Sequence, residues 1–316
     1  MRAGLPALAT LATFAALALL ATPPASAQAE GPVAVHVDVH VISFGNYDVN
    51  KGTYTMDLYL HLWYDPSTAP AGFDATHFEF MNGRAASKEL LSDESAAGQR
   101  DLWYRIQANL YSDSSFDHYP FDEQHLRLQL EDSIHPATQL VYVPDLSGSG
   151  LDEDVNVSGW RIRGTHASAT TKAYDFDDDY SRFGFTVTIH REPTSAALRT
   201  FLPPFAFMIV SGLSFALHPS KFGQRITFGT SMLISAVGFH VSQTVSLPTL
   251  GKLTLFDQIM LSAYAFLAAS LVVTALIAHN EDYAKKDGWS ERVNRQGLWA
   301  SLALPVVVFI LLRLVG

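Results

Sequence analysis

The spacing of apolar residues changes near Arg191, and this change limits what the chain can fold into more than any other feature. Before Arg191, apolar and polar residues alternate. The first such stretch has every second residue apolar on one face, namely Val33, Val35, Val37, Val39 and Val41. The alternation recurs in TYTMDLYLHLWYD, LRLQLE, TQLVYV, GWRIRG and FGFTVTIH, and turn residues separate these stretches. Many short alternating segments with such turns predict an antiparallel, immunoglobulin-like β-sandwich.

Beyond Arg191, long apolar runs replace the alternation. Each run is about as long as a helix that crosses a hydrocarbon layer of ~30 Å. We expect helices at about 197–217, 222–246, 254–279 and 295–315. The predicted fold class is therefore α+β, with a sandwich over residues 28–192 and a transmembrane bundle of four helices over 193–316.

Residues 1–27 have the pattern of a signal peptide. Arg2 supplies a positive start, Leu8 to Leu20 form an apolar run, and Ala25-Ser26-Ala27 offers a small-residue cleavage site. A further membrane helix is the alternative, but the run is short and ends at Pro23. Lysine and arginine gather in the loops after the first and third helices, which predicts that these loops are cytoplasmic and the sandwich external.

The composition and the motif content argue against several classes of protein. The formal net charge of -10 leaves no basic surface for a nucleic acid partner. The chain has no cysteine, so no disulfide can stabilise an exported sandwich. Because a G-x-S-x-G elbow, an H-E-x-x-H helix and a phosphate-binding loop are all missing from the sequence, we do not expect an enzyme.

The second helical run is more polar than the other three. At helical spacing one stripe contains Thr227, Ser231, Ile234, Gly238, Val241 and Val245, with Ser242 beside it. Such a stripe can line water when several copies surround an axis, and a ring of Ile234 or Val241 can close the path by dewetting. The alternative is that the hydroxyl groups form hydrogen bonds between packed helices.

Several motifs, in their order along the chain, resemble the pentameric ligand-gated ion channels, the family of nicotinic, glycine and GABA receptors. SDSSFDHYPFDEQHL (112–126) resembles the signature loop, with Ser112 and Leu126 where animal members carry bridged cysteines. LHLWYDP (60–66) and HFEFMN (77–82) resemble two further landmarks. Four single residues also match characteristic positions of the family, namely Arg191, Pro203, Arg225 and Pro248. The third helical run looks like that of the amine-gated bacterial members, so the resemblance points to a prokaryotic homopentamer.

The resemblance implies a small-molecule agonist that binds between subunits, under the hairpin at residues 172–183. The residues expected at this site are Tyr174, Phe176, Tyr180, Glu79, Glu131, Tyr59 and Trp63. Aromatic faces attract ammonium groups, and a neighbouring carboxylate favours a primary amine over a neutral ligand. The alternatives are that the tyrosines merely cover the sandwich and that Glu131 is a solvated acid at a strand end.

The resemblance also implies a coupling element between the sandwich and the helices. Its expected members are Tyr119, Pro120, Phe121, Asp122, Arg191 and Pro248. Asp122 is expected to pair with Arg191, and the aromatic side chains to dock on the outer helix ends. The bond before Pro120 follows an aromatic residue, so a cis form is an option. Plain packing between domains is the alternative.

The resemblance places Gln224 at the cytoplasmic mouth of the pore, where cation-selective relatives usually carry glutamate. The acidic external half favours cations, so we expect monovalent cations to permeate. A proton-gated channel, an anion channel and a non-conducting binding protein anchored in lipid are the alternatives. The resemblance implies a multi-pass protein of the bacterial inner (cell) membrane, with its sandwich in the periplasm or outside.

Two clusters raise the question of metal binding. Asp177, Asp178 and Asp179 could hold a modulatory Ca²⁺, but a solvated loop tip is the simpler interpretation. His36, Asp38 and His40 alternate on one strand face, which is a weak metal signal without a fourth ligand. We therefore expect no cofactor and no resident metal.

Overall fold

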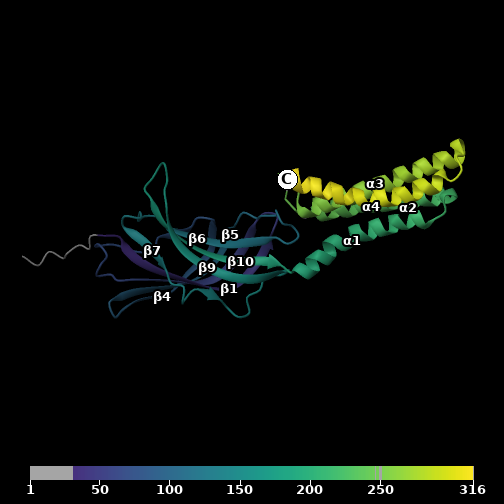
Figure 1. Ribbon diagram of the computed structural model, residues 1–316. Helices are drawn as coiled ribbons and strands as arrows, with labels where there is room; N and C mark the ends of the chain where they lie inside the picture. The colour runs from purple at the N-terminus through teal and green to yellow at the C-terminus, as the bar shows by residue number, and fades with distance from the viewer. Residues whose placement is uncertain (1–30, 246, 249–250, 316) are drawn as a thin grey trace, which may run out of the picture.

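The computed structural model describes residues 31–245, 247–248 and 251–315, so the expected signal peptide at residues 1–27 lies outside the described residues. A β-sandwich forms one end of the elongated molecule and a helical bundle forms the other (Figure 1). The end of the last helix returns to the junction between these two parts.

The sandwich consists of two sheets with separate strand orders. The first sheet contains, in order, β4 (Gly83–Ala96), β5 (Gln99–Tyr111), β2 (Thr53–Tyr64), β1 (Val33–Asp48) and β7 (Leu140–Pro144), with β8 (Gly150–Leu151) also paired to β1. The second sheet contains β3 (Phe78–Phe80), β6 (Glu123–Asp132), β10 (Tyr180–Arg191) and β9 (Trp160–Lys172). The pairings are antiparallel except that β1 runs parallel to β7 and to β8.

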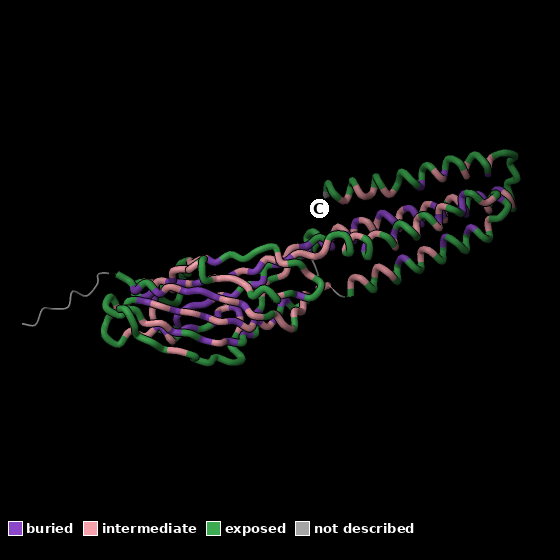
Figure 2. The backbone as a smooth tube through the Cα atoms, turned by 90° about the horizontal axis from the view of Figure 1, so that it is seen from below, coloured by how far each residue is buried: buried purple, intermediate pink, exposed green. Residues whose placement is uncertain are grey.

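Buried residues run through the middle of the sandwich (Figure 2), and they form one apolar core with members from strands of both sheets. The valines of β1 are almost completely buried, as are the alternating residues of β10, which are Phe183, Phe185, Val187 and Ile189. This burial supplies the main driving force for the domain, at about 25 cal/mol per Å² of apolar surface.

Two long strands were not predicted from the sequence. β4 has no alternating apolar pattern and is exposed at most positions, Leu90 and Leu91 included, because it forms the outer edge of its sheet. β5 does alternate, and its buried side chains are Leu102, Tyr104, Ile106, Ala108 and Leu110. The alternation of apolar residues in β5 was therefore sufficient to predict this strand from the sequence.

The bundle contains α1 (Pro193–Leu213), α2 (Phe222–Thr244), α3 (Leu255–His279) and α4 (Trp289–Val315). α1 begins at Pro193 instead of 197, since proline at the first helical position has a backbone angle already suited to a helix. α3 begins with a capping box, in which Thr254 Oγ1 accepts from the Asp257 backbone N–H and Asp257 Oδ2 accepts from that of Thr254.

Within the described part of the chain, three helices are long and apolar enough to cross a membrane, namely α1, α3 and α4. α2 does not meet that criterion, because hydroxyl, amide and imidazole side chains interrupt its apolar residues. α3 contacts each of the other three helices. α2 is thus a polar helix held beside three apolar ones.

Candidate functional site

The hairpin between β9 and β10 gathers three aromatic side chains. The ring of Tyr174 lies 5.5 Å from that of Phe176 and 6.1 Å from that of Tyr180, measured between centroids. Phe176 is 85% exposed, so an apolar ring stands at the tip with little of its own chain around it. These rings border a pocket of about 210 Å³ that Glu79, Glu131 and Ser133 also line.

Glu131 is not the solvated strand-end acid that was one reading of the sequence, because its side chain is buried. Its Oε1 accepts a hydrogen bond of 2.5 Å from Arg182 Nε, and its Oε2 accepts one of 2.9 Å from Tyr174 Oη. Arg182 Nη2 also donates to Tyr174 Oη at 2.9 Å. The negative charge of Glu131 is therefore balanced by Arg182 of the same chain, and the Glu131 carboxylate positions Tyr174. Partial burial, followed by the nearby Glu131, raises the pKa of Tyr174, which keeps it a hydrogen-bond donor.

Glu79 is the carboxylate that remains available at this pocket. It lies opposite Glu131 in the pairing of β3 with β6, and its side chain is exposed. Within the described ranges, no cationic side chain lies within ion-pair distance of Glu79, so a ligand cation would meet it without displacing a partner.

Tyr59 and Trp63 lie on the outer face of β2, in the other sheet, and do not join the hairpin within one chain. Arg105 holds Tyr59, with Nη1 donating to Tyr59 Oη at 3.0 Å and the guanidinium 4.9 Å from the ring centroid. The two sets of residues can meet only if a second copy of the chain supplies one of them.

A second cluster lies on the outer face of β1, β2 and β5 and was not predicted from the sequence. His61 Nδ1 lies 3.0 Å from Asp38 Oδ2, and Nε2 lies 3.3 Å from Asp101 Oδ1. The imidazole stacks between two indoles, with centroids 4.0 Å from Trp103 and 4.6 Å from Trp63. The spacing of His61 and Trp63 on one strand face was visible, but the carboxylates come from other strands.

The weak metal signals do not form a site in the described residues, where no group of three potential ligands converges. Asp38 pairs with His61, and His40 Nε2 lies 4.0 Å from Asp152 Oδ2. Asp177 to Asp179 are exposed at the hairpin tip, and Asp177 Oδ1 accepts from the Asp178 backbone N–H.

At the junction of the two domains, Asp122 pairs with Arg191 as expected. Arg191 Nε donates to Asp122 Oδ1 at 2.6 Å, and the carboxylate is 1% exposed. Gln124 Nε2 donates to the other oxygen, Asp122 Oδ2, at 2.8 Å. The Arg191 guanidinium lies over two rings, 4.5 Å from Trp160 and 5.2 Å from Tyr119.

The aromatic residues around Pro120 dock on the outer ends of two helices. Tyr119 is buried and its ring lies edge-on to Phe256 of α3, with centroids 6.2 Å apart. Phe121 is half-exposed and lies 5.8 Å from Phe201 of α1. The bond between Tyr119 and Pro120 is cis. Pro248 lines a separate pocket at the outer end of α2, together with Leu247 and Asp257.

The predicted stripe on α2 faces away from the rest of the chain. Its members and the neighbouring Ser242 are all exposed, and so is Gln224 at the inner end of the helix. The exposed residues are Gln224, Thr227, Ser231, Ile234, Gly238, Val241, Ser242 and Val245. Ile234 is 73% exposed and Val245 is 77% exposed. The opposite face packs inward through Arg225, Gly229 and Ala236. His240 points to α3, with Nε2 3.0 Å from Asp257 Oδ1 and Nδ1 3.1 Å from Tyr264 Oη.

Comparisons with known proteins match both domains. The proton-gated ion channel of Gloeobacter violaceus is 23% identical over 297 residues, or 88% of this chain and 81% of that protein. The human gamma-aminobutyric acid receptor subunit rho-3 is 22% identical over 270 residues, 78% of this chain and 58% of that subunit. The pH-sensitive chloride channel 2 of Anopheles gambiae is 26% identical over 201 residues, 61% of this chain but only 33% of that channel. No family model matches the chain.

Proposed function

The chain belongs to the family of pentameric ligand-gated ion channels, which are not enzymes, and from this premise we propose that five copies of it surround an ion pore lined by α2. The exposed stripe of α2 carries the proposal, because its polar members suit neither lipid nor the interior of the chain. Thr227 Oγ1 donates to the Gly223 carbonyl of its own helix at 3.0 Å, which argues against the alternative of hydrogen bonds between helices.

The proposed permeant ions are monovalent cations. Residues 28–192 contain 26 Asp and Glu against 11 Lys and Arg, a formal net charge of -15, which concentrates cations outside the pore. The positive charge of Arg225 does not face the cations in the proposed pore, because the residue is only 1% exposed. Its guanidinium donates to Asn294 Oδ1 at 2.7 Å and lies beside the ring of Phe215. Currents through the purified protein in bilayers, recorded under a salt gradient, test this directly. A reversal potential near that of chloride would overturn the cation assignment.

For gating, we propose a small amine held between subunits by the hairpin rings and Glu79. Tyr174 and Phe176 can offer ring faces to an ammonium group, at about 0.5–2 kcal/mol each. The exposed carboxylate of Glu79 supplies the matching charge, since Arg182 already neutralises Glu131. Tyr59 and Trp63 of the neighbouring copy are the proposed opposite wall.

Replacing Glu79 with glutamine is expected to raise the amine concentration for half-maximal current about tenfold, because one charge-assisted contact of about 1.5 kcal/mol is lost. Glu89→Gln is the matched control, since Glu89 is also an exposed acid on a strand, β4, and lies outside the pocket. Agonist dose–response curves in bilayers give the measurement. Identical curves for Glu79→Gln and the unmodified channel would remove Glu79 from the site.

Gating by protons is the second candidate, and the environment of His61 favours it. Burial lowers the pKa of His61, but hydrogen bonds and charges from Asp38 and Asp101 outweigh burial, so its pKa lies above the ordinary value. A neutral imidazole can donate to only one of the two carboxylates, whereas the protonated ring can donate to both. The groups that face it are Asp38 from β1, Asp101 from β5 and, beyond Trp63, His36 from β1.

Because the folded-state pKa is raised, protonated His61 stabilises the sandwich fully below the unfolded value near 6.5, and this stability is lost as pH rises through the folded pKa. The unmodified protein should therefore melt higher than His61→Gln at a pH below 6.5, and this advantage should disappear as the pH rises through the folded-state pKa of His61. His36→Gln, a ring in the same stack, is the control. A pH-independent difference between His61→Gln and the unmodified protein would exclude His61 as a proton-binding group.

A further inference from the structure

Four acids line the agonist pocket at the hairpin between β9 and β10, namely Glu79, Glu131, Asp132 and Asp177. Two of them are buried and already held by their own chain, because Glu131 pairs with Arg182 and Asp132 Oδ1 lies 2.9 Å from Nδ1 of His135. The other two, Glu79 and Asp177, are exposed. The pocket therefore offers a ligand two carboxylates, one on β3 and one on the hairpin.

The charge of Asp177 is unbalanced within the part of the chain that the structure describes. No lysine, arginine or histidine of that part lies within ion-pair distance of it. Its Oδ1 accepts a hydrogen bond of 2.8 Å from the Asp178 backbone N–H, which leaves the carboxylate charged. Partial burial, followed by the charges of Asp177 and Asp178, raises the pKa of Tyr180, so the field of these acids reaches the pocket wall.

The rest of the lining suits a short apolar chain with cationic ends. The three hairpin rings and the side chain of Met81 border the same pocket. Lys172 Nζ lies 5.9 Å from the centroid of the Tyr174 ring, so a primary ammonium group of the chain itself already rests near this ring. The pocket holds about 210 Å³, which is less than the roughly 300–1,000 Å³ typical of sites for drug-sized ligands.

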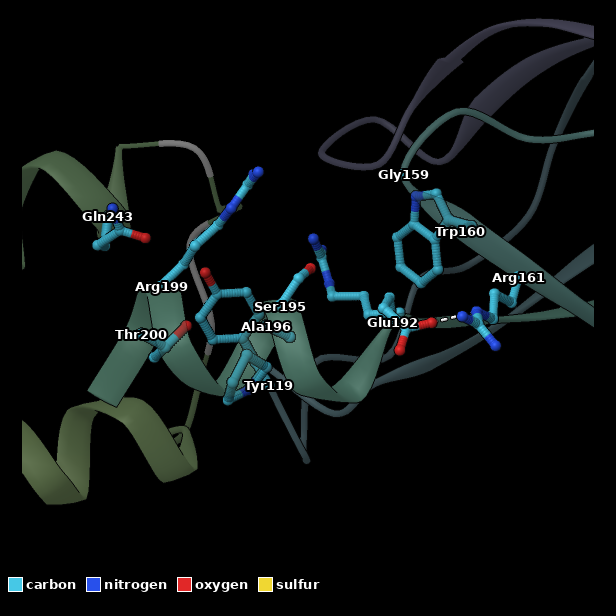
Figure 3. A pocket seen from close by; sticks show the side chains of 12 residues that line it. Tyr119, Gly159, Trp160, Arg161, Glu192, Ser195, Ala196, Arg199, Thr200 and Gln243 are labelled. Carbon is cyan, nitrogen blue, oxygen red and sulfur yellow. Dashed lines mark ion pairs between the residues drawn. The ribbon is translucent and has the colours of Figure 1, made fainter. Parts of the chain in front are cut away.

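The larger pocket at the junction of the sandwich and the helices has the opposite charge (Figure 3). It holds about 620 Å³, and its lining includes three arginines, Arg161, Arg191 and Arg199, against one acid, Glu192. Glu192 already pairs with Arg161, as the dashed line in Figure 3 marks. The junction therefore repels a dication, whereas the hairpin pocket attracts one.

We propose that the hairpin pocket takes a short α,ω-diamine as its agonist, with one ammonium group at Glu79 and the other at Asp177. This inference rests on the amine gating proposed above and names the class of amine. Each carboxylate pairs with one charge of the ligand, and the methylene chain lies against the hairpin rings. A monoamine of the same length satisfies only one of the two carboxylates.

Isothermal titration calorimetry on the solubilised full-length protein tests this proposal without requiring a current. Diamines with three to six carbons are compared with monoamines of the same chain length, for example 1,4-diaminobutane with butylamine. At least one diamine should bind about tenfold more tightly than its monoamine, because it makes one more charge-assisted contact. Asp177→Asn should remove this preference and leave the binding of butylamine unchanged.

The matched control is Asp178→Asn. Asp178 is the next residue along the hairpin and is also exposed, but it does not line the pocket. Its replacement removes the same charge, so it accounts for a general loss of attraction for cations. A diamine preference that survives in Asp177→Asn, or that falls equally in Asp178→Asn, would contradict the proposal.

The outcomes separate the diamine preference from amine gating. Equal binding of diamines and monoamines, with currents evoked by both, would overturn the preference and leave amine gating intact. Tighter binding of a diamine that evokes no current would support the preference and overturn amine gating. A protein that binds neither kind of amine would overturn both.

Discussion

Replacing Asp122 with alanine is expected to abolish opening by any stimulus and to lower the free energy of unfolding by about 3 kcal/mol. The carboxylate is 1% exposed and bridges Arg191 to Gln124. Gln124 in turn holds Ser115, accepting from its backbone N–H at 3.0 Å and donating to its carbonyl at 2.7 Å. Removing Asp122 leaves a guanidinium without its carboxylate and disconnects the signature loop from the start of α1.

The matched control for this change is Glu123→Ala. Glu123 is the next residue and also pairs with an arginine at 2.6 Å, but its partner Arg163 is 69% exposed, so the expected cost is below about 1 kcal/mol. Thermal unfolding of the solubilised protein and evoked currents give the two measurements. Normal currents with normal stimulus sensitivity in Asp122→Ala would contradict the coupling role, and Asp122→Asn would separate lost charge from lost volume.

Replacing Ile234 with serine is expected to produce a channel that conducts without a stimulus, with resting current about tenfold or more above background. Ile234 is the large apolar residue in the middle of the exposed stripe and is 73% exposed. In a pentamer every copy would present it to the axis, so one substitution would change the whole ring. A hydroxyl ring holds water where a hydrocarbon ring expels it.

Val272→Ser on α3 controls for the cost of a hydroxyl in the membrane, since Val272 is 59% exposed but lies on a helix that is not expected at the pore. Its resting current should equal that of the unmodified channel. If Ile234→Ser shows no resting current above background, another residue must close the pore, and Val241 would be the next candidate.

Much of the sandwich could be predicted because alternation is local. The β1 valines and the β10 aromatics follow a period of two, and burial of one sheet face makes that pattern visible. β4 could not be found in this way, because an edge strand exposed on both faces has no apolar period. Its position depends on pairing with β5, which local sequence does not encode.

The candidate site shows the same division. The hairpin tyrosines cluster as expected, because they lie within one short loop. The pairing of Arg182 with Glu131 depends on the register of β10 against β6, and the two residues are 51 positions apart. His61 likewise meets Asp38 and Asp101 only through the register of three strands. Side chains that converge from different strands lie beyond what spacing along one strand can predict.

The central claim is that the exposed face of α2 lines an ion path, and cysteine modification tests it most directly. The chain has no cysteine, so a single substitution supplies the only thiol. A charged thiol reagent should block the current through Ile234→Cys and Ser231→Cys, and should leave Ala236→Cys unaffected because Ala236 is fully buried. Unchanged current through Ile234→Cys after complete modification, verified by mass, would contradict the account.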